Sequence, residues 1–292
     1  MAHDTFQVGD LTAIIGDNAA HGEHRAGYNG VHSLVHRTEP MNLFVPTVAG
    51  LNLEHIMDGD QELRDVQAGR KVFFEPRNAP MQFKKLSDVE AELHQEPTPT
   101  FHLESWTRFK LVAPHYIDFN FRFRPTQHAF RHGWIGLFWA SYLNAPEDKS
   151  MYFRGERQWL QLCTPRHNHQ STVIHKDDRF DPKFTANLGD ALFKNYSPLR
   201  FEEPFFYGLV RKHVFLLMFD RHEGIRLTHS PSGGGFNATL QTTNPAWDFQ
   251  YVLPQYEVLK EYGFRARAVY RERCDRAEVL REVAEWGKSL AG

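Results

Sequence analysis

The sequence has few cysteines, no long apolar run and almost no net charge. Its two cysteines, Cys163 and Cys274, form neither a zinc-binding spacing nor a disulfide framework. No stretch approaches the roughly 18 consecutive apolar residues of a membrane span. A formal net charge of −2 over 292 residues offers no electrostatic attraction to nucleic acid or to an anionic membrane. These absences predict a protein with no nucleic-acid partner and no membrane partner.

The N-terminal residues 1–9 lack a basic segment followed by an apolar stretch, so no secretory signal is predicted. A hydrophobic share of 41% and a charged share of 24% are typical of a globular protein with a sizeable core. The default expectation is therefore a cytoplasmic enzyme or binding protein. Phenylalanine and histidine are abundant, with 24 and 17 residues. Most of the phenylalanines are expected to fill a wide core between sheets, whereas the scattered histidines supply titratable groups.

Alternation with a period of two is the strongest pattern in the chain. In the two runs between residues 100 and 125 the apolar positions are mainly Phe101, Leu103, Phe109, Leu111, Phe119, Phe121 and Phe123, with charged or polar residues between most of them. Such alternation predicts antiparallel strands with one face on the core. Shorter apolar runs elsewhere, among them residues 72–75, bring the prediction to at least twelve strands.

The order of these elements predicts the fold class. Strand follows strand without β-α-β alternation, which favours an all-β fold, either a β-sandwich or a barrel. One short C-terminal helix is predicted at 275–290, where Asp275 can cap it and apolar residues recur at helical spacing. Residues 164–200 are charged and weakly periodic, which predicts an irregular excursion or a lid. No linker is visible, so residues 1–292 are predicted to form a single domain.

The stretch Asp17–Tyr28 concentrates groups that can carry chemistry. It holds His21, Glu23, His24, Arg25 and Tyr28 between two predicted strands, and its glycines disfavour regular structure. Catalytic groups are often placed on loops held by a rigid scaffold. We predict His24 as a general acid and Glu23 as a general base, with Arg25 and Tyr28 contacting the substrate.

A second stretch, Gly224–Gln250, carries a similar set around the triple glycine at 233–235. His229 is a second candidate acid and Asp248 a second candidate base. Sugars are bound by aromatic rings that stack on their CH faces and by polar groups that take their hydroxyls. The residues predicted to bind substrate in this way are Arg226, Trp247 and Gln250, together with Trp139. Glu54 with His55, and Arg166 with His167, His169 and His175, are two further places where acid/base groups gather.

Other chemistries find less support in the residues. His21 and His24 could serve as ligands for zinc, manganese or iron, because imidazole suits these metals. His167 and His169 resemble the paired histidines of cupins, but the glutamate and glycine of that motif are missing. The chain has no Gly-x-Ser-x-Gly elbow for a nucleophilic serine and no dinucleotide fingerprint.

The closing segments Trp247–Pro254 and Tyr262–Tyr270, the chain length and the unbroken series of strands resemble the galactose mutarotase-like superfamily. That superfamily contains aldose epimerases and several polysaccharide lyases. The resemblance implies a large two-sheet sandwich and a carbohydrate substrate. In such epimerases a histidine protonates the ring oxygen of the sugar while a glutamate removes the proton of the anomeric hydroxyl. The late acidic residue of this chain would be Asp248.

The sequence therefore predicts a carbohydrate-active enzyme that works by general acid/base catalysis, either an epimerase or a β-eliminating lyase. Its substrate would be a small sugar or an oligosaccharide, and no cofactor would be required. One alternative is a metal-dependent sugar lyase or hydrolase that holds a divalent metal through His21 and His24. The other is a non-catalytic carbohydrate-binding protein with the same sandwich.

Overall fold

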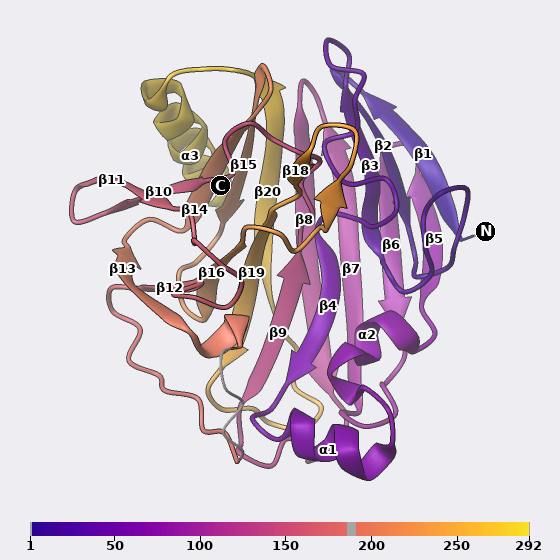
Figure 1. The fold of residues 1–292 in the computed structure, drawn as a ribbon. Coiled ribbons are helices and arrows are strands. Elements are labelled where there is room, and N and C mark those ends of the chain that lie inside the picture. The colour runs from indigo at the N-terminus through magenta and orange to yellow at the C-terminus, as the bar shows by residue number, and fades with distance from the viewer. Residues whose placement is uncertain (1, 186–190, 292) are drawn as a thin grey trace.

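Two large sheets face each other in the computed structural model, which describes residues 2–185 and 191–291 (Figure 1). One sheet has nine strands and the other has six. Nearly all pairings are antiparallel, with β12 and β13 forming a parallel pair. The predicted all-β sandwich is confirmed. No helix among the described residues is long and apolar enough to cross a membrane.

The nine-stranded sheet has the order β11-β10-β14-β15-β20-β8-β7-β6-β5. Its strands are β5 (Gln82–Ser87), β6 (Glu90–Gln95), β7 (Leu103–Val112), β8 (Tyr116–Pro125), β10 (Met151–Gly155), β11 (Gln158–Leu162), β14 (Phe205–Val210), β15 (His213–Phe219) and β20 (Tyr262–Glu272). The two alternating runs seen in the sequence are β7 and β8, which pair with Phe109 opposite Phe119. Strand β20 lies between β15 and β8, so the last strand of the chain joins two halves of the sheet.

The six-stranded sheet has the order β13-β12-β16-β19-β9-β4. Its strands are β4 (Asn52–Met57), β9 (Ile135–Ala140), β12 (Thr172–His175), β13 (Tyr196–Phe201), β16 (Ile225–Ser230) and β19 (Ala246–Leu253). Alternate residues of β9 divide between its two faces. Leu137 and Trp139 join the core between the sheets, whereas Phe138 and Ala140 join a second apolar cluster on the other side. We call that side of the six-stranded sheet its outer face.

Smaller elements complete the fold. They are a three-stranded sheet of β1 (His3–Val8), β2 (Leu11–Gly16) and β3 (Gly30–His36), a hairpin of β17 (Phe236–Asn237) and β18 (Thr242–Thr243), and the helices α1 (Gln61–Ala68), η1 (Val72–Phe74), α2 (Glu75–Asn78), η2 (Leu192–Lys194) and α3 (Arg276–Ala291). The predicted strand at 72–75 is therefore wrong, because these residues form η1 and the start of α2. The predicted C-terminal helix is confirmed as α3. Asp275 caps it by accepting a hydrogen bond from the Glu278 amide at 2.8 Å.

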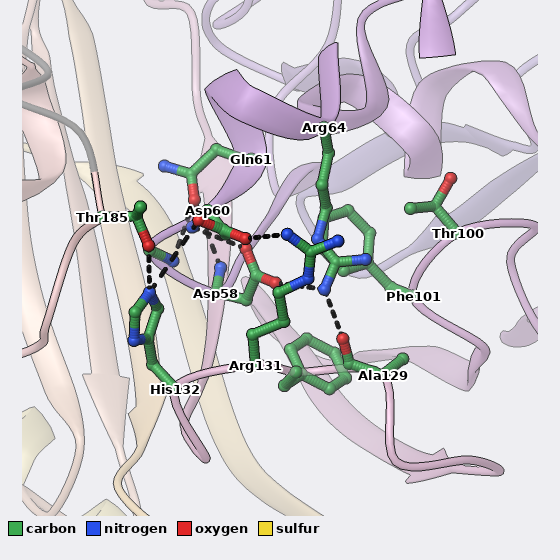
Figure 2. A network of polar contacts seen from close by, with 12 residues as sticks. Asp58, Asp60, Gln61, Arg64, Thr100, Phe101, Ala129, Arg131, His132 and Thr185 are labelled. Atoms are coloured by element: carbon green, nitrogen blue, oxygen red, sulfur yellow. Dashed lines mark hydrogen bonds and ion pairs between the residues drawn. The ribbon is translucent and has the colours of Figure 1, made fainter. Parts of the chain in front are cut away.

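The predicted excursion at 164–200 contains β12, η2 and β13, and its residues 186–190 lie outside the described residues. The part that precedes them is fastened to the loop between β4 and α1 (Figure 2). The Thr185 amide donates to the Gly59 carbonyl at 3.0 Å, and His132 lies 2.7 Å from the Thr185 hydroxyl. In the same network Asp60 pairs with Arg131 at 2.6 Å. A Cβ on Gly59 would lie 2.0 Å from the Lys183 carbonyl oxygen, so this close approach requires glycine.

Candidate active site

A cavity of about 510 Å³ lies where the loop after β9 meets three other loops. Its lining consists of Arg25, Tyr28, Val45, Pro46, Thr47, Val48, Tyr142, Asn144, Gly233, Gly234, Gly235, Phe236, Asn237 and Asn244. The cavity thus brings together residues from the two stretches that the sequence singles out, although more than 200 residues separate Arg25 from Gly233. Aromatic rings, side-chain amides and one guanidinium line it, which suits a ligand with several hydroxyl groups.

Tyr142 connects this cavity to a buried carboxylate. Its hydroxyl donates to Glu54, with the two carboxylate oxygens at 2.7 and 2.8 Å. Arg77 Nη1 lies 3.0 Å from Glu54 Oε1 and forms an ion pair with it. Burial raises the pKa of Glu54, and the Arg77 guanidinium opposes that rise. Burial and the neighbouring Glu54 raise the pKa of Tyr142 well above its ordinary value, so the phenol stays neutral.

An irregularity in β4 gives Glu54 its position. Leu53 pairs with Trp139 and His55 pairs with Phe138, which leaves Glu54 as an extra residue without a partner on β9. This β-bulge shifts the alternation, so the side chains of Glu54 and His55 both contact residues of the outer face. Burial keeps the His55 imidazole neutral by lowering its pKa well below the ordinary value. The bulge therefore places two titratable side chains on the outer face, and one of them, Glu54, contacts Tyr142.

Asp248 is the second buried carboxyl group of the outer face. It lies in β19, is only 2% exposed and accepts a hydrogen bond from the Ser141 amide at 3.0 Å. Burial is the main cause of its strongly raised pKa, and the charge of Glu54 adds to it. Asp248 therefore holds its proton to a higher pH than a free aspartate does, whereas Glu54 accepts hydrogen bonds from Arg77 and Tyr142. Neighbouring carboxyl groups in different environments are suited to separate acid and base roles.

Tyr28 is placed in the cavity wall by two arginines. The Arg77 guanidinium lies 4.0 Å from the centroid of its ring, and that of Arg25 lies 5.3 Å away. Arg25 Nη2 also donates to the Tyr28 hydroxyl at 3.3 Å. The ring of Tyr28 meets that of Tyr142 edge-on, with 5.9 Å between centroids. The two tyrosines thus form an ordered aromatic corner in the wall of the cavity.

The hairpin that precedes Tyr28 carries the other predicted residues of this stretch. His21 and His24 exchange two backbone hydrogen bonds, and Glu23 is exposed at its tip. The ring nitrogens of His24 face the carbonyl oxygens of Val48 at 3.0 Å and Tyr28 at 2.8 Å. Since Val48 and Tyr28 both line the cavity, His24 holds part of the cavity wall from behind.

Three residues predicted to act on substrate lie between the two sheets instead. His229 Nε2 donates to the Lys149 carbonyl at 2.8 Å, and the Thr164 hydroxyl lies 2.8 Å from its Nδ1. Trp247 Nε1 donates to the same Lys149 carbonyl, and Trp139 stacks on Phe249 in the core with 4.9 Å between ring centroids. None of these three side chains is in the lining of the described cavity.

Arg226 and Gln250 belong to the outer face but are buried under other segments. Arg226 is only 1% exposed, and its guanidinium donates to Asp178, Phe180 and Tyr196. Gln250 donates to Thr228 at 2.9 Å and to Thr172 at 3.2 Å. Arg226 therefore fastens the segment at 178–180 to the sheet, whereas Gln250 links three strands of the sheet to one another.

Tyr142, Asn144 and Arg77 were not predicted as site residues, and Glu54 was noted only as a place where acid/base groups gather. One signal in the sequence could have identified Glu54 as a candidate site residue. The apolar residues Leu51 and Leu53 are two positions apart, but Ile56 follows after three, which indicates an extra residue in the strand. Arg77 carries no comparable signal, because its contact with Glu54 depends on how α2 packs against β4.

Neither a protein-family model nor a curated protein matches the chain by sequence. Solved structures with a similar fold do exist. A candidate aldose 1-epimerase from Escherichia coli K12 superposes with a TM-score of 0.52 at 10% identity, over 93% of this chain and 99% of that one. The chain has a galactose mutarotase-like fold.

Two larger proteins match this chain over part of their own length. A 4-alpha-glucanotransferase from Thermococcus litoralis matches with a TM-score of 0.50 at 10% identity, over 91% of this chain and 37% of that one. A heparan sulfate lyase from Pedobacter heparinus matches with a TM-score of 0.48 at 9% identity, over 94% and 36%. At such identities the likeness concerns the fold and not the activity.

Proposed function

We propose that this protein is a carbohydrate-active enzyme that epimerises a sugar by general acid/base catalysis in the cavity beside Tyr142. The observation that carries the proposal is the Tyr142 hydroxyl, which lines the cavity and donates to the buried carboxylate of Glu54. The full-length likeness in fold to a candidate aldose 1-epimerase makes epimerisation the first reaction to test.

In the proposed step the anomeric hydroxyl of the sugar gives its proton to Tyr142 while Tyr142 passes its own proton to Glu54. Tyr142 thereby remains neutral, as its raised pKa requires. Arg77 keeps Glu54 ready to accept this proton by favouring the carboxylate form. Asp248 holds its proton to a higher pH than a free aspartate does, and we assign it as the acid for the ring oxygen. Because Asp248 is buried and is not in the cavity lining, its proton would reach the sugar through one water molecule.

The remaining lining residues would bind the sugar. Tyr28 and Phe236 offer aromatic surface to its CH groups, while Arg25, Asn237 and Asn244 offer polar groups to its hydroxyls. A cavity of about 510 Å³ accommodates a monosaccharide with room for a substituent or part of a second ring.

The test is to incubate the purified protein with a panel of free aldoses, sugar acids and oligosaccharides and to follow the products by NMR. Exchange between anomers or epimers is the expected result, and Tyr142→Phe should lower its rate by about 100-fold or more. The matched control is Tyr116→Phe, because Tyr116 also donates to a carboxylate, Glu282, at 3.0 Å, but lies outside the cavity. The control should retain the full rate.

Three outcomes would contradict the proposal in different ways. An unsaturated sugar product would identify a lyase, and sugar binding without conversion would identify a binding protein. Equal rates for Tyr142→Phe and the unmodified protein would remove Tyr142 from the mechanism.

A further inference from the structure

Imidazole side chains gather behind the cavity wall in a way that the acid/base proposal does not use. His21, His24 and His32 each bring one ring nitrogen to within 4.8 Å of the others. They come from the hairpin of residues 21–24 and from β3. His3 of β1 stacks on His21 with 3.7 Å between ring centroids, so a fourth imidazole adjoins the group. We call His3, His21, His24 and His32 the histidine cluster.

The contacts of His32 leave it a ring nitrogen suited to a metal. Its Nε2 donates to the Asp17 carbonyl at 3.1 Å, which leaves a lone pair on Nδ1. That lone pair faces His21 Nε2 at 2.7 Å. A ligating histidine usually donates its other N–H to a carbonyl or carboxylate, because this contact fixes the tautomer and the orientation of the ring. His32 already has that second contact.

His24 has one contact that a neutral imidazole cannot satisfy. Both of its ring nitrogens face carbonyl oxygens, of Val48 and of Tyr28, and a neutral ring has a single N–H. One nitrogen therefore directs its lone pair at an oxygen. In the described part of the chain, the buried His3 Nδ1 likewise has no hydrogen-bond partner.

The chemistry of the donors selects the ion. We propose that the histidine cluster binds one zinc ion through three of its members, His21, His32 and His24. All three donors are imidazoles, which suit zinc in tetrahedral coordination and not magnesium or calcium.

The rearrangement needed is small for His21 and His32, whereas His24 would have to give up one of its two carbonyl contacts. Zinc–nitrogen bonds of about 2.1 Å place two tetrahedral ligands about 3.4 Å apart, so His21 and His32 would separate by about 0.7 Å from their hydrogen-bonded distance of 2.7 Å. His21 is half-buried on a hairpin containing Gly22, whose backbone φ is +53°, and can move more readily than His32 in its strand. The ion would fasten this hairpin, and with it Tyr28 of the cavity wall, to β3.

The test is isothermal titration of the full-length, chelator-treated protein with zinc chloride alone. One zinc per chain is expected, and His21→Gln should weaken its binding by about 100-fold or more. His32→Gln should do the same, with circular dichroism checking that each variant is folded. The spectrum of the cobalt-loaded protein should show tetrahedral coordination by nitrogen.

The control is His94→Gln. His94, Glu96 and Glu104 form a second group whose ligand atoms lie within 4.8 Å of one another, but Glu104 is already paired with Arg124. The control should bind zinc as the unmodified protein does. The proposal would be overturned if zinc did not bind stoichiometrically. It would also be overturned if zinc binding survived both His21→Gln and His32→Gln, or if it were lost in His94→Gln. No substrate enters this experiment, so its result is independent of the proposed epimerase activity.

Discussion

His229 and Trp247 donate to the same oxygen, the carbonyl of Lys149, each at 2.8 Å. They are also paired across β16 and β19. Side chains of two neighbouring strands therefore anchor Lys149, which lies in the segment before β10. With its Nε2 donating to this carbonyl and its Nδ1 facing the Thr164 hydroxyl, His229 fits the neutral form. The Thr164 amide N–H donates to Nδ1 at 3.3 Å. A proton on Nδ1 would therefore face another donor instead of an acceptor.

The first prediction concerns stability in acid. Burial lowers the pKa of His229 to about 4, from 6.5 for a free imidazole. The unfolded chain therefore takes up a proton between pH 6.5 and pH 4 that the folded chain resists, so stability falls as the pH is lowered through this range. The loss attributable to His229 is about 3 kcal/mol at full effect. Urea unfolding of the unmodified protein and of His229→Gln at several pH values measures it. The difference in unfolding free energy between the two should shrink as the pH falls, and a constant difference would contradict the account.

The second prediction concerns packing across the sandwich. A Cβ on Gly208 of β14 would lie 2.1 Å from the ring of Trp247, so Gly208→Ala forces the indole or the strand to move. Overpacking of this kind costs about 1–3 kcal/mol, which thermal unfolding would register as a lower Tm. Gly287→Ala is the matched control, because a Cβ there meets no atom within 4 Å and lies in α3. That substitution should raise the Tm slightly, since alanine favours a helix.

The third prediction separates the charge of Asp248 from its shape. Asp248→Asn keeps an oxygen to accept from the Ser141 amide but cannot release a proton. Because the pKa of Asp248 is raised in the fold, its stabilising effect is complete below about pH 4 and declines as the pH rises. The free energy of unfolding of Asp248→Asn should therefore fall less between pH 4 and pH 8 than that of the unmodified protein. The epimerase rate of Asp248→Asn should be lower than that of the unmodified protein. A fully active Asp248→Asn variant would exclude Asp248 as the acid.

The fourth prediction concerns the pH dependence of turnover. Glu54 must be ionised to take a proton from Tyr142, and burial raises its pKa above 4.5. The rate should therefore fall in acid with a midpoint above that value. Arg77→Met removes the charge that lowers this pKa, so the midpoint should move to higher pH. A midpoint that stays in place would show that Glu54 is not the titrating base.

The sandwich was predictable because its strands alternate so regularly. In β7 and β8 the apolar side chains face the core at every second position, as the sequence pattern requires. The helices α1 and α2 were missed, because the apolar side chains of α1 are exposed, with Val66 at 80%, and make no amphipathic stripe against a core. Helix-forming residues ending at Gly69, which adopts φ +63°, were the available signal.

The candidate site was predictable only in part, since it depends on which face each strand turns outward. His229 and Trp247 were expected at the site. They are paired across β16 and β19, and both side chains point into the core, whereas Asp248 points to the outer face. A shift of one residue exchanges the two faces of a strand. Every residue of β16 and β19 is buried except Leu253 at the end of β19, so the sequence pattern does not reveal which face is which.

The position of β20 has a consequence for how the chain comes to be folded. During synthesis the strands β5–β8 and the strands β10, β11, β14 and β15 are complete while the strand that lies between β8 and β15 has yet to emerge. Until Tyr262–Glu272 inserts, β8 and β15 each present an unpaired edge that can join a foreign strand. The nascent protein is thus exposed to aggregation until β20 has emerged and inserted, and a chain truncated before β20 retains two open half-sheets.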